Sequence, residues 1–210
     1  MSHTLHRIKD KQPDADYVVL VMPARGINND DVVGHYQKYI DIFKKYNPVN
    51  MGGMKIGLLL DNTPEELKVN ACDDAPMVHA VFRTKEDLTG VLGEIKDKDY
   101  GFSVVVSGLL DDVRDCAEKV GLKPHSYNFS LGVYGALDKL PPRPVLEICT
   151  MCGHAMVTPG LVQKLAADIR KGKTTTEKAA EKLTRPCMCG IFNTAKAKAV
   201  LERIVESPEV

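Results

Sequence analysis

Dense apolar runs alternate with amphipathic stretches along the first two thirds of the chain. Residues 17–22 form a run of β-forming side chains that ends at Pro23 and Gly26, which predicts a buried strand. Between such runs, apolar side chains recur every three or four positions, as on one face of a helix. The pattern predicts strands over residues 17–22, 55–60, 77–82, 102–106 and 127–134, helices over 29–46, 85–96 and 109–120, a short helix after the turn at 61–66, and a loop over 48–53.

The alternation of strands and helices predicts an α/β sandwich of about five strands, with helices against the sheet, over residues 17–139. Residues 1–16 are largely polar and are expected to form a flexible arm. The stretch 140–144 reads Leu-Pro-Pro-Arg-Pro and predicts a linker, because proline continues neither helix nor strand. We therefore expect a second, smaller domain over residues 145–210.

Helix cap signals dominate this second domain. Thr158, followed by proline, opens a helix that carries apolar residues on one side and stops near Gly172. Thr174 fits a capping box for a short helix over 177–183. Asn193 or Thr194 caps a third helix that ends near residue 205. The domain is therefore predicted to be a small helical unit.

The composition limits the classes of binding partner and the cellular compartment that we expect for this protein. The net charge is zero, tryptophan is absent and aromatic residues are only 6%, so neither a phosphate-binding field nor a base-stacking platform is expected. No run approaches the roughly 20 apolar residues of a membrane helix, and the polar first ten residues do not resemble a signal peptide. We expect a cytoplasmic protein that binds neither nucleic acid nor membrane, and whose six cysteines are reduced.

Two cysteine pairs frame the helical unit, and thiolates are the soft ligands of zinc and iron–sulfur clusters. The second cysteine of each pair is followed by a glycine, Gly153 or Gly190, which would let backbone N–H groups approach the sulfur atoms. Each pair also precedes a helix, whose positive N-terminal end would offset thiolate charge. The predicted ligands are Cys149 and Cys152, separated by 34 residues from Cys187 and Cys189.

The cysteines alone leave the metal open. Four thiolates satisfy tetrahedral zinc, and they equally satisfy a [2Fe–2S] or a [4Fe–4S] cluster. Zinc pairs most often sit on β-knuckles, whereas this segment is predicted to be helical. His154 follows the second cysteine by two residues and is expected next to the ligands, donating to a sulfur atom, although ligation or a plain surface position fits the same spacing.

The cysteine pairs, their helices and the stretch 174–183 together resemble the helical [2Fe–2S] domain of the bacterioferritin-associated ferredoxin family. The resemblance covers about 60 of the 210 residues. In that family the C-x-C pair comes first and the C-x-x-C pair follows; here Cys149 and Cys152 come first, so the order is reversed. The resemblance implies an iron–sulfur cluster, with [2Fe–2S] favoured, on the four cysteines. Residues 1–140 resemble no family that we recognise.

The remaining candidates add little to this picture. Cys116 falls on a predicted helix and is expected in the core, whereas Cys72 lies in a polar loop where a reactive role is the less favoured interpretation. His125 precedes a predicted strand, where a turn residue without a role is the simpler reading. Neither a Walker loop nor a dinucleotide-binding glycine motif is present, and no catalytic set is predicted, so enzymatic activity stays open.

Three functional hypotheses follow from these residues. The first is an iron–sulfur protein that acts as an electron-transfer or accessory component of an anaerobic redox enzyme system, with a protein redox partner or a larger complex. The second is a non-redox binding or scaffold protein whose tail is held by a structural four-cysteine zinc site. The third, which four equivalent cysteines disfavour, is an enzyme that uses an open cluster position for Lewis-acid chemistry.

Overall fold

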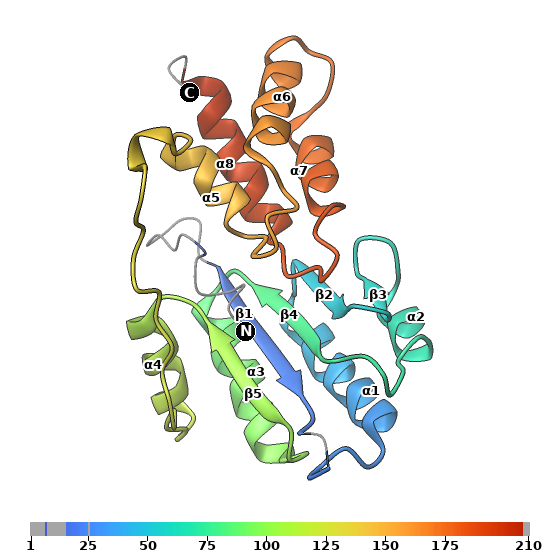
Figure 1. Cartoon of the computed structure of the whole chain (residues 1–210). Helices are drawn as coiled ribbons and strands as arrows, with labels where there is room; N and C mark the ends of the chain where they lie inside the picture. Colours follow the sequence, from blue (N-terminus) through green and yellow to red (C-terminus); the bar gives the residue numbers. More distant parts are fainter. Residues whose placement is uncertain (1–6, 8–15, 25, 208–210) are drawn as a thin grey trace. The chain divides into compact units, whose positions relative to one another are not determined.

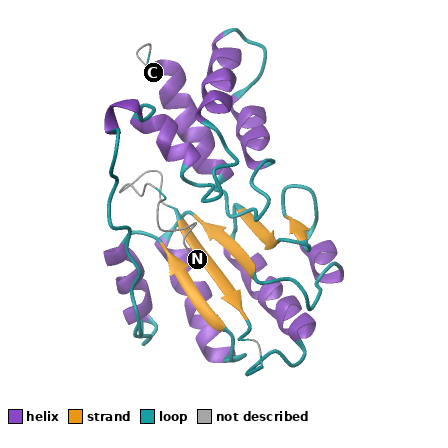
Figure 2. Ribbon diagram, viewed as in Figure 1, coloured by secondary structure: helices purple, strands orange, loops and turns teal. Residues whose placement is uncertain are grey.

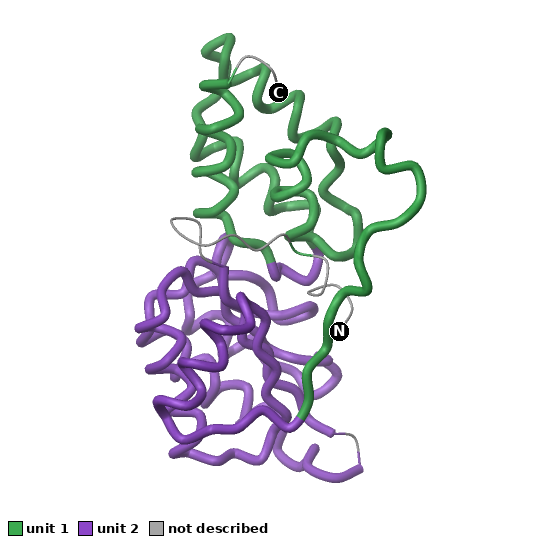
Figure 3. Tube along the Cα trace, turned by 90° about the vertical axis from the view of Figure 1, so that its left-hand side faces the viewer, with its two compact units in different colours: residues 1–10, 126–187, 192–210 green, residues 11–125, 188–191 purple. Residues whose placement is uncertain are grey.

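The protein is described here by a computed structural model that covers residues 7, 16–24 and 26–207 (Figure 1). The chain forms two compact units (Figure 3). One contains residues 11–125 together with 188–191, and we call it the sheet unit. The other contains residues 126–187 and 192–210 with the first ten residues, and we call it the helical unit. Of the arm predicted over residues 1–16, all but residues 7 and 16 lie outside the described residues.

The sheet unit is built on a five-stranded antiparallel sheet in the order β3-β2-β4-β1-β5 (Figures 1 and 2). The interior strand β1 is the apolar run recognised in the sequence, and Val19 pairs with Ala80 of β4 on one side and with Val106 of β5 on the other. The crossovers β1-α1-β2 and β4-α3-β5 interleave, which gives a split βαβ arrangement. The strands are β1 (Tyr17–Met22), β2 (Asn50–Gly53), β3 (Gly57–Leu58), β4 (Val78–Phe82) and β5 (Ser103–Ser107).

Four helices complete this unit, and α1 and α3 cover one face of the sheet (Figure 1). The core between them contains alternate residues of β1 and the buried faces of both helices, including Tyr36 and Phe43. The Tyr36 hydroxyl donates to the carbonyl of Ala75 at 2.8 Å, which satisfies its buried polar group. The helices are α1 (Val32–Phe43), α2 (Pro64–Val69), α3 (Lys85–Lys98) and α4 (Leu110–Lys119), with a 3₁₀ turn η2 (Lys44–Tyr46) after α1.

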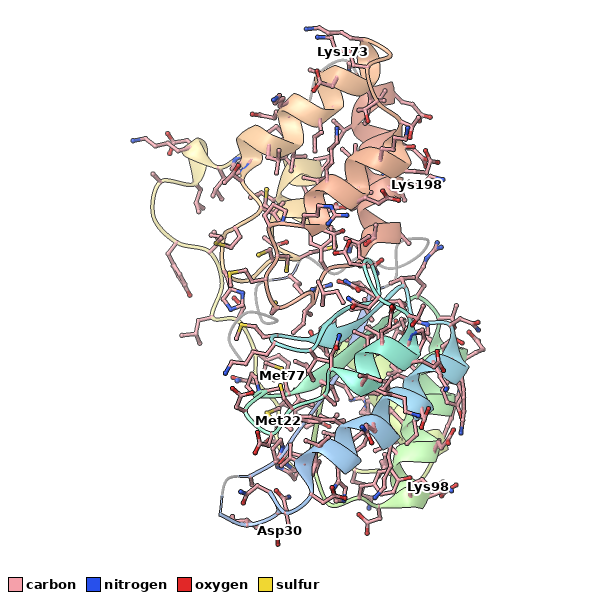
Figure 4. All side chains as sticks on the ribbon, turned by 90° about the vertical axis from the view of Figure 1, so that its right-hand side faces the viewer. Met22, Asp30, Met77, Lys98, Lys173 and Lys198 are labelled. Carbon is pink, nitrogen blue, oxygen red and sulfur yellow. The ribbon has the colours of Figure 1, made fainter. Side chains whose placement is uncertain are left out.

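The helical unit contains four helices and a 3₁₀ turn, η3 (Leu137–Lys139). Predicted caps form at Thr158, which accepts from the N–H of Leu161, and at Asn193, which accepts from Lys196. The middle helix is capped by Thr175 rather than Thr174. Lys198, which is labelled on α8 in Figure 4, pairs with Glu177 at 2.7 Å. The helices are α5 (Arg143–Cys149), α6 (Pro159–Arg170), α7 (Thr176–Thr184) and α8 (Thr194–Glu206).

The α/β sandwich and the helical C-terminal region are confirmed, while several local predictions are wrong. Residues 48–53, expected to be a loop, contain β2, and only Gly57–Leu58 of the expected strand 55–60 pairs with a neighbour. A Cβ on Gly53 would lie 2.6 Å from the carbonyl oxygen of Met77, so glycine is what lets β2 approach this backbone. Helix α5 was not predicted, and it begins within the proline-rich stretch because Pro144 occupies the first turn, where proline is tolerated.

The predicted strand 127–134 is also wrong. No described strand pairs with this segment, although its side chains alternate between apolar and polar. Seven of the large apolar side chains in and just after it are exposed, up to 88% for Leu131. They are Tyr127, Phe129, Leu131, Val133, Tyr134, Leu137 and Leu140. The alternation of apolar and polar side chains in this segment therefore produces an exposed apolar surface and not a strand of the sheet.

Candidate metal centre at the cysteine loop

The first cysteine pair lies in a tight loop between α5 and α6, which we call the cysteine loop and define as residues 149–157. Helix α5 ends at Cys149, and the N–H of Cys152 then donates to the carbonyl of Cys149 at 3.1 Å. Ala155 takes the left-handed conformation, with φ of 56°, and its N–H donates to Cys152 O at 3.2 Å. The chain thus curls around Cys152 before Thr158 caps α6.

Cys152 occupies the centre of this loop and is only 3% exposed. The thiol of Cys187 donates a hydrogen bond to its sulfur atom, and the backbone N–H groups of His154, Met156 and Val157 point to the same atom. These donors outweigh the effect of burial and lower the pKa of Cys152 to about 5. The loop is therefore built to hold a thiolate at this position even in the metal-free chain.

The other three cysteines of the predicted set have environments that differ from that of Cys152. Burial, with the nearby charge of Cys152, raises the pKa of Cys149 to about 11. Cys187 follows α7, is fully buried, and its N–H donates to Thr184 O at 3.0 Å. Cys189 is 5% exposed. No disulfide joins any of the six cysteines, all of which lie among the described residues.

Segment 188–191 packs in the sheet unit. Gly190 has φ of 70°, its carbonyl accepts from Asn50 Nδ2 at 2.7 Å, and a Cβ at this position would lie 1.9 Å from a methyl carbon of Leu58. Gly190 is therefore required for close packing against β2 and β3. Gly153, by contrast, is exposed, and the positive φ of the cysteine loop falls on Ala155.

The helical unit thus brings Cys149, Cys152 and Cys187 together, from two stretches that lie far apart in the sequence. Within the described ranges, no group of three or more His, Cys, Asp or Glu side chains is arranged as a finished metal site. The donors themselves fit a soft metal, because a buried cysteine sulfur that receives backbone N–H groups, as Cys152 does, is the kind of ligand that zinc and iron–sulfur centres use. The four-cysteine ligand set remains a prediction.

No sequence pattern pointed to Arg7, which is 4% exposed and donates from Nη1 to the carbonyl of Met151 at 2.8 Å. Met151 lies between the two cysteines of the loop. Glu147 was missed as well; it is buried on α5 and receives a 2.6 Å bond from Arg203 on α8, which ties the helix that carries Cys149 to the last helix. A single charged residue produces no periodicity or motif spacing in the sequence, so the roles of these two residues could not be predicted from it.

The remaining candidate residues differ clearly in burial and in their contacts. Cys116 is buried in the core of the sheet unit, as predicted, and its sulfur donates to Lys85 O at 3.6 Å. Cys72 is partly buried, and burial followed by its bond to Asp74 raises its pKa, which disfavours a reactive thiolate. The His125 side chain is exposed. His154 also has an exposed side chain, and it is its backbone N–H that reaches Cys152.

No family model, curated protein or solved structure matches the chain. No helix in the described part of the chain combines the length and apolar character that crossing a membrane requires. Function is therefore argued from the cysteine loop and its surroundings.

The thiolate at Cys152 predicts a pH dependence in the metal-free protein. Its folded pKa of about 5 lies below the ordinary value of 9.0, so its contribution to stability is complete above pH 9 and is lost as the pH falls through the folded pKa. Ultraviolet thiolate absorbance should titrate near pH 5 in the wild type. Cys152→Ala should remove this step and flatten the unfolding free energy over the same range. A first thiolate step near the ordinary value would contradict the hydrogen-bond pattern.

Proposed function

We propose that the chain binds an iron–sulfur cluster on Cys149, Cys152, Cys187 and Cys189 and serves as an electron-transfer or accessory component of a redox enzyme system. The observation that carries the proposal is the preformed thiolate position at Cys152, with three backbone N–H groups and the thiol of Cys187 directed at one sulfur. Backbone N–H donors to sulfur stabilise thiolate ligands and tune the potential of such centres.

The chain's own residues supply three things to this site. The backbone donors hold negative charge on Cys152, burial of Cys152, Cys187 and Cys189 excludes water, and the Glu147–Arg203 pair fixes α5 against α8. A bound cluster would supply one-electron redox chemistry. The resemblance to bacterioferritin-associated ferredoxin supports [2Fe–2S] as the favoured cluster, with [4Fe–4S] on the same ligands as the alternative form.

Metal and sulfide analysis tests this proposal directly. Full-length protein purified without oxygen should contain iron and acid-labile sulfide and absorb visible light, because thiolate-bound iron–sulfur clusters are coloured. The Cys149→Ser protein should contain much less of both. Stoichiometric zinc without iron or sulfide would overturn the redox proposal in favour of a structural zinc site, and a metal-free wild type would overturn both.

An accessory role also requires a surface for a protein partner, and segment 127–137 supports it. Its apolar side chains are exposed, and no Asp, Glu, Lys or Arg occurs between Lys123 and Asp138. Such an uncharged, aromatic surface suits an apolar groove on a larger redox protein.

If these side chains serve binding rather than folding, removing them should leave stability almost unchanged. Leu131→Ala is expected to change the free energy of unfolding by less than about 0.5 kcal/mol, because Leu131 is 88% exposed. The matched substitution Leu183→Ala, at a fully buried position on α7, should cost about 2–5 kcal/mol. Chemical denaturation measures both, and a comparable loss in the two variants would show that the segment is part of the core.

A further inference from the structure

Arg7 is a charged residue whose burial the proposed function leaves unexplained. Its side chain belongs to the helical unit, is 4% exposed, and donates a 2.8 Å bond from Nη1 to the carbonyl of Met151. Burial of a guanidinium is costly unless hydrogen bonds or a negative charge compensate for it. The acceptor is the peptide between Cys149 and Cys152, so this cation is held at the backbone that presents both thiols.

The predicted ligand set creates the charge that such a cation would balance. Four thiolates carry more negative charge than a zinc ion or a [2Fe–2S] core neutralises, so the bound centre is anionic. Cys152, Cys187 and Cys189 are buried, and an anionic centre among buried ligands needs a nearby positive group. Backbone N–H groups provide part of this at Cys152. Arg7 is a full positive charge that the structure places at the same loop.

We propose that Arg7 is a positioning residue for the thiolate centre, which fixes the Met151 peptide through its hydrogen bond and offsets the charge of the bound metal and its ligands. This inference rests on the proposed function, since it requires that the cysteines bind a metal. The two parts of the role are separable, because Arg7→Lys keeps the charge and loses the planar fork, whereas Arg7→Gln keeps an N–H donor and loses the charge.

Arg170 offers a matched control in the same unit. Its guanidinium also donates to backbone carbonyls, from Nη2 to Ile204 at 2.5 Å and to Ser207 at 2.9 Å, at the end of α8. Arg170→Gln therefore removes arginine-to-carbonyl bonds at an exposed place without cysteines, and circular dichroism checks separately whether the loss of the buried Arg7 disturbs folding. A general loss of stability would appear in both variants, whereas an effect on the centre would appear only at Arg7.

The experiment loads the full-length wild type, Arg7→Gln, Arg7→Lys and Arg170→Gln with metal and measures retention against a competing chelator, with circular dichroism as a check of folding. Arg7→Gln should bind the metal about tenfold or more weakly, the range typical of residues that support metal ligands. Arg7→Lys should lose less, and Arg170→Gln should match the wild type. If the centre is an iron–sulfur cluster, its reduction potential should fall in Arg7→Gln and stay near the wild-type value in Arg7→Lys.

The outcomes separate this inference from the proposed function. A wild-type protein that binds no metal overturns both. A wild type that binds metal, with equal retention in Arg7→Gln, overturns only the role of Arg7. Equal losses in Arg7→Gln and Arg170→Gln would show a structural effect and would also overturn it. Should Arg7→Gln not fold, the metal retention of Arg7→Lys decides: a loss that Arg170→Gln does not share would support the role of Arg7, and retention equal to that of the wild type would overturn it.

Discussion

The Cys152→Ser protein is expected to lose its bound metal while it remains folded. Serine offers a hard oxygen that stays protonated at neutral pH, so the soft, preformed thiolate of the site disappears. The backbone N–H groups of His154, Met156 and Val157 would then point at a neutral hydroxyl. Metal content per chain should fall to roughly a tenth or less of the wild-type value, because metal affinity depends on deprotonated ligands. Elemental analysis after purification without oxygen measures this.

Cys72→Ser is the matched control for this substitution. Cys72 is a free, partly buried thiol in the sheet unit, and it is not one of the predicted ligands. The control should keep the wild-type metal content, and both variants should keep the wild-type circular dichroism. A Cys152→Ser protein that holds a full complement of metal would show that the cysteine loop does not bind it.

Gly190→Ala is expected to destabilise the sheet unit strongly. The position has φ of 70°, where an L-residue costs about 1–2 kcal/mol, and its new Cβ would lie 1.9 Å from a methyl carbon of Leu58. Overpacking of this kind typically costs a further 1–3 kcal/mol or so. The free energy of unfolding, measured by chemical denaturation, should therefore fall by roughly 2–5 kcal/mol.

A double substitution separates the two causes. Leu58→Ala removes the side chain that the new Cβ would strike, so Gly190→Ala should cost less in a Leu58→Ala background than in the wild type. The remaining cost should be that of the left-handed backbone alone. If the cost were the same in both backgrounds, the contact with Leu58 would not be the reason for glycine at this position.

The predictions from sequence succeeded where one local signal and the tertiary environment agree. Strand β1 is a continuous apolar run, and β4 is apolar apart from His79. Both are buried along their length except for the partly exposed Met22 at the end of β1, so propensity and burial favour the same structure. In Figure 4, Met22 lies beside Met77, where the β1–β4 pairing ends. The helix caps at Thr158 and Asn193 could be predicted from the sequence alone, because a cap needs only its own hydroxyl or amide and a backbone N–H three residues later.

Failures occurred where the decisive interaction lies with a distant residue. Strand β2 contains two glycines, and its pairing depends on the close approach of β3 and β4 rather than on its own side chains. Segment 127–134 has ideal alternation, but no described strand receives it. At the candidate site, spacing identified the cysteines, whereas the backbone donors at Cys152 and the cation at Met151 depend on how the loop folds.

The bond between Arg7 and Met151 also has a consequence for folding during synthesis. It joins residues that are 144 positions apart, so it forms only after most of the chain has left the ribosome, and it closes the longest loop that a described side-chain bond spans. The second cysteine pair is synthesised later still, so Arg7 can dock on the Met151 peptide before Cys187 and Cys189 exist, and this contact can precede the assembly of the four predicted ligands.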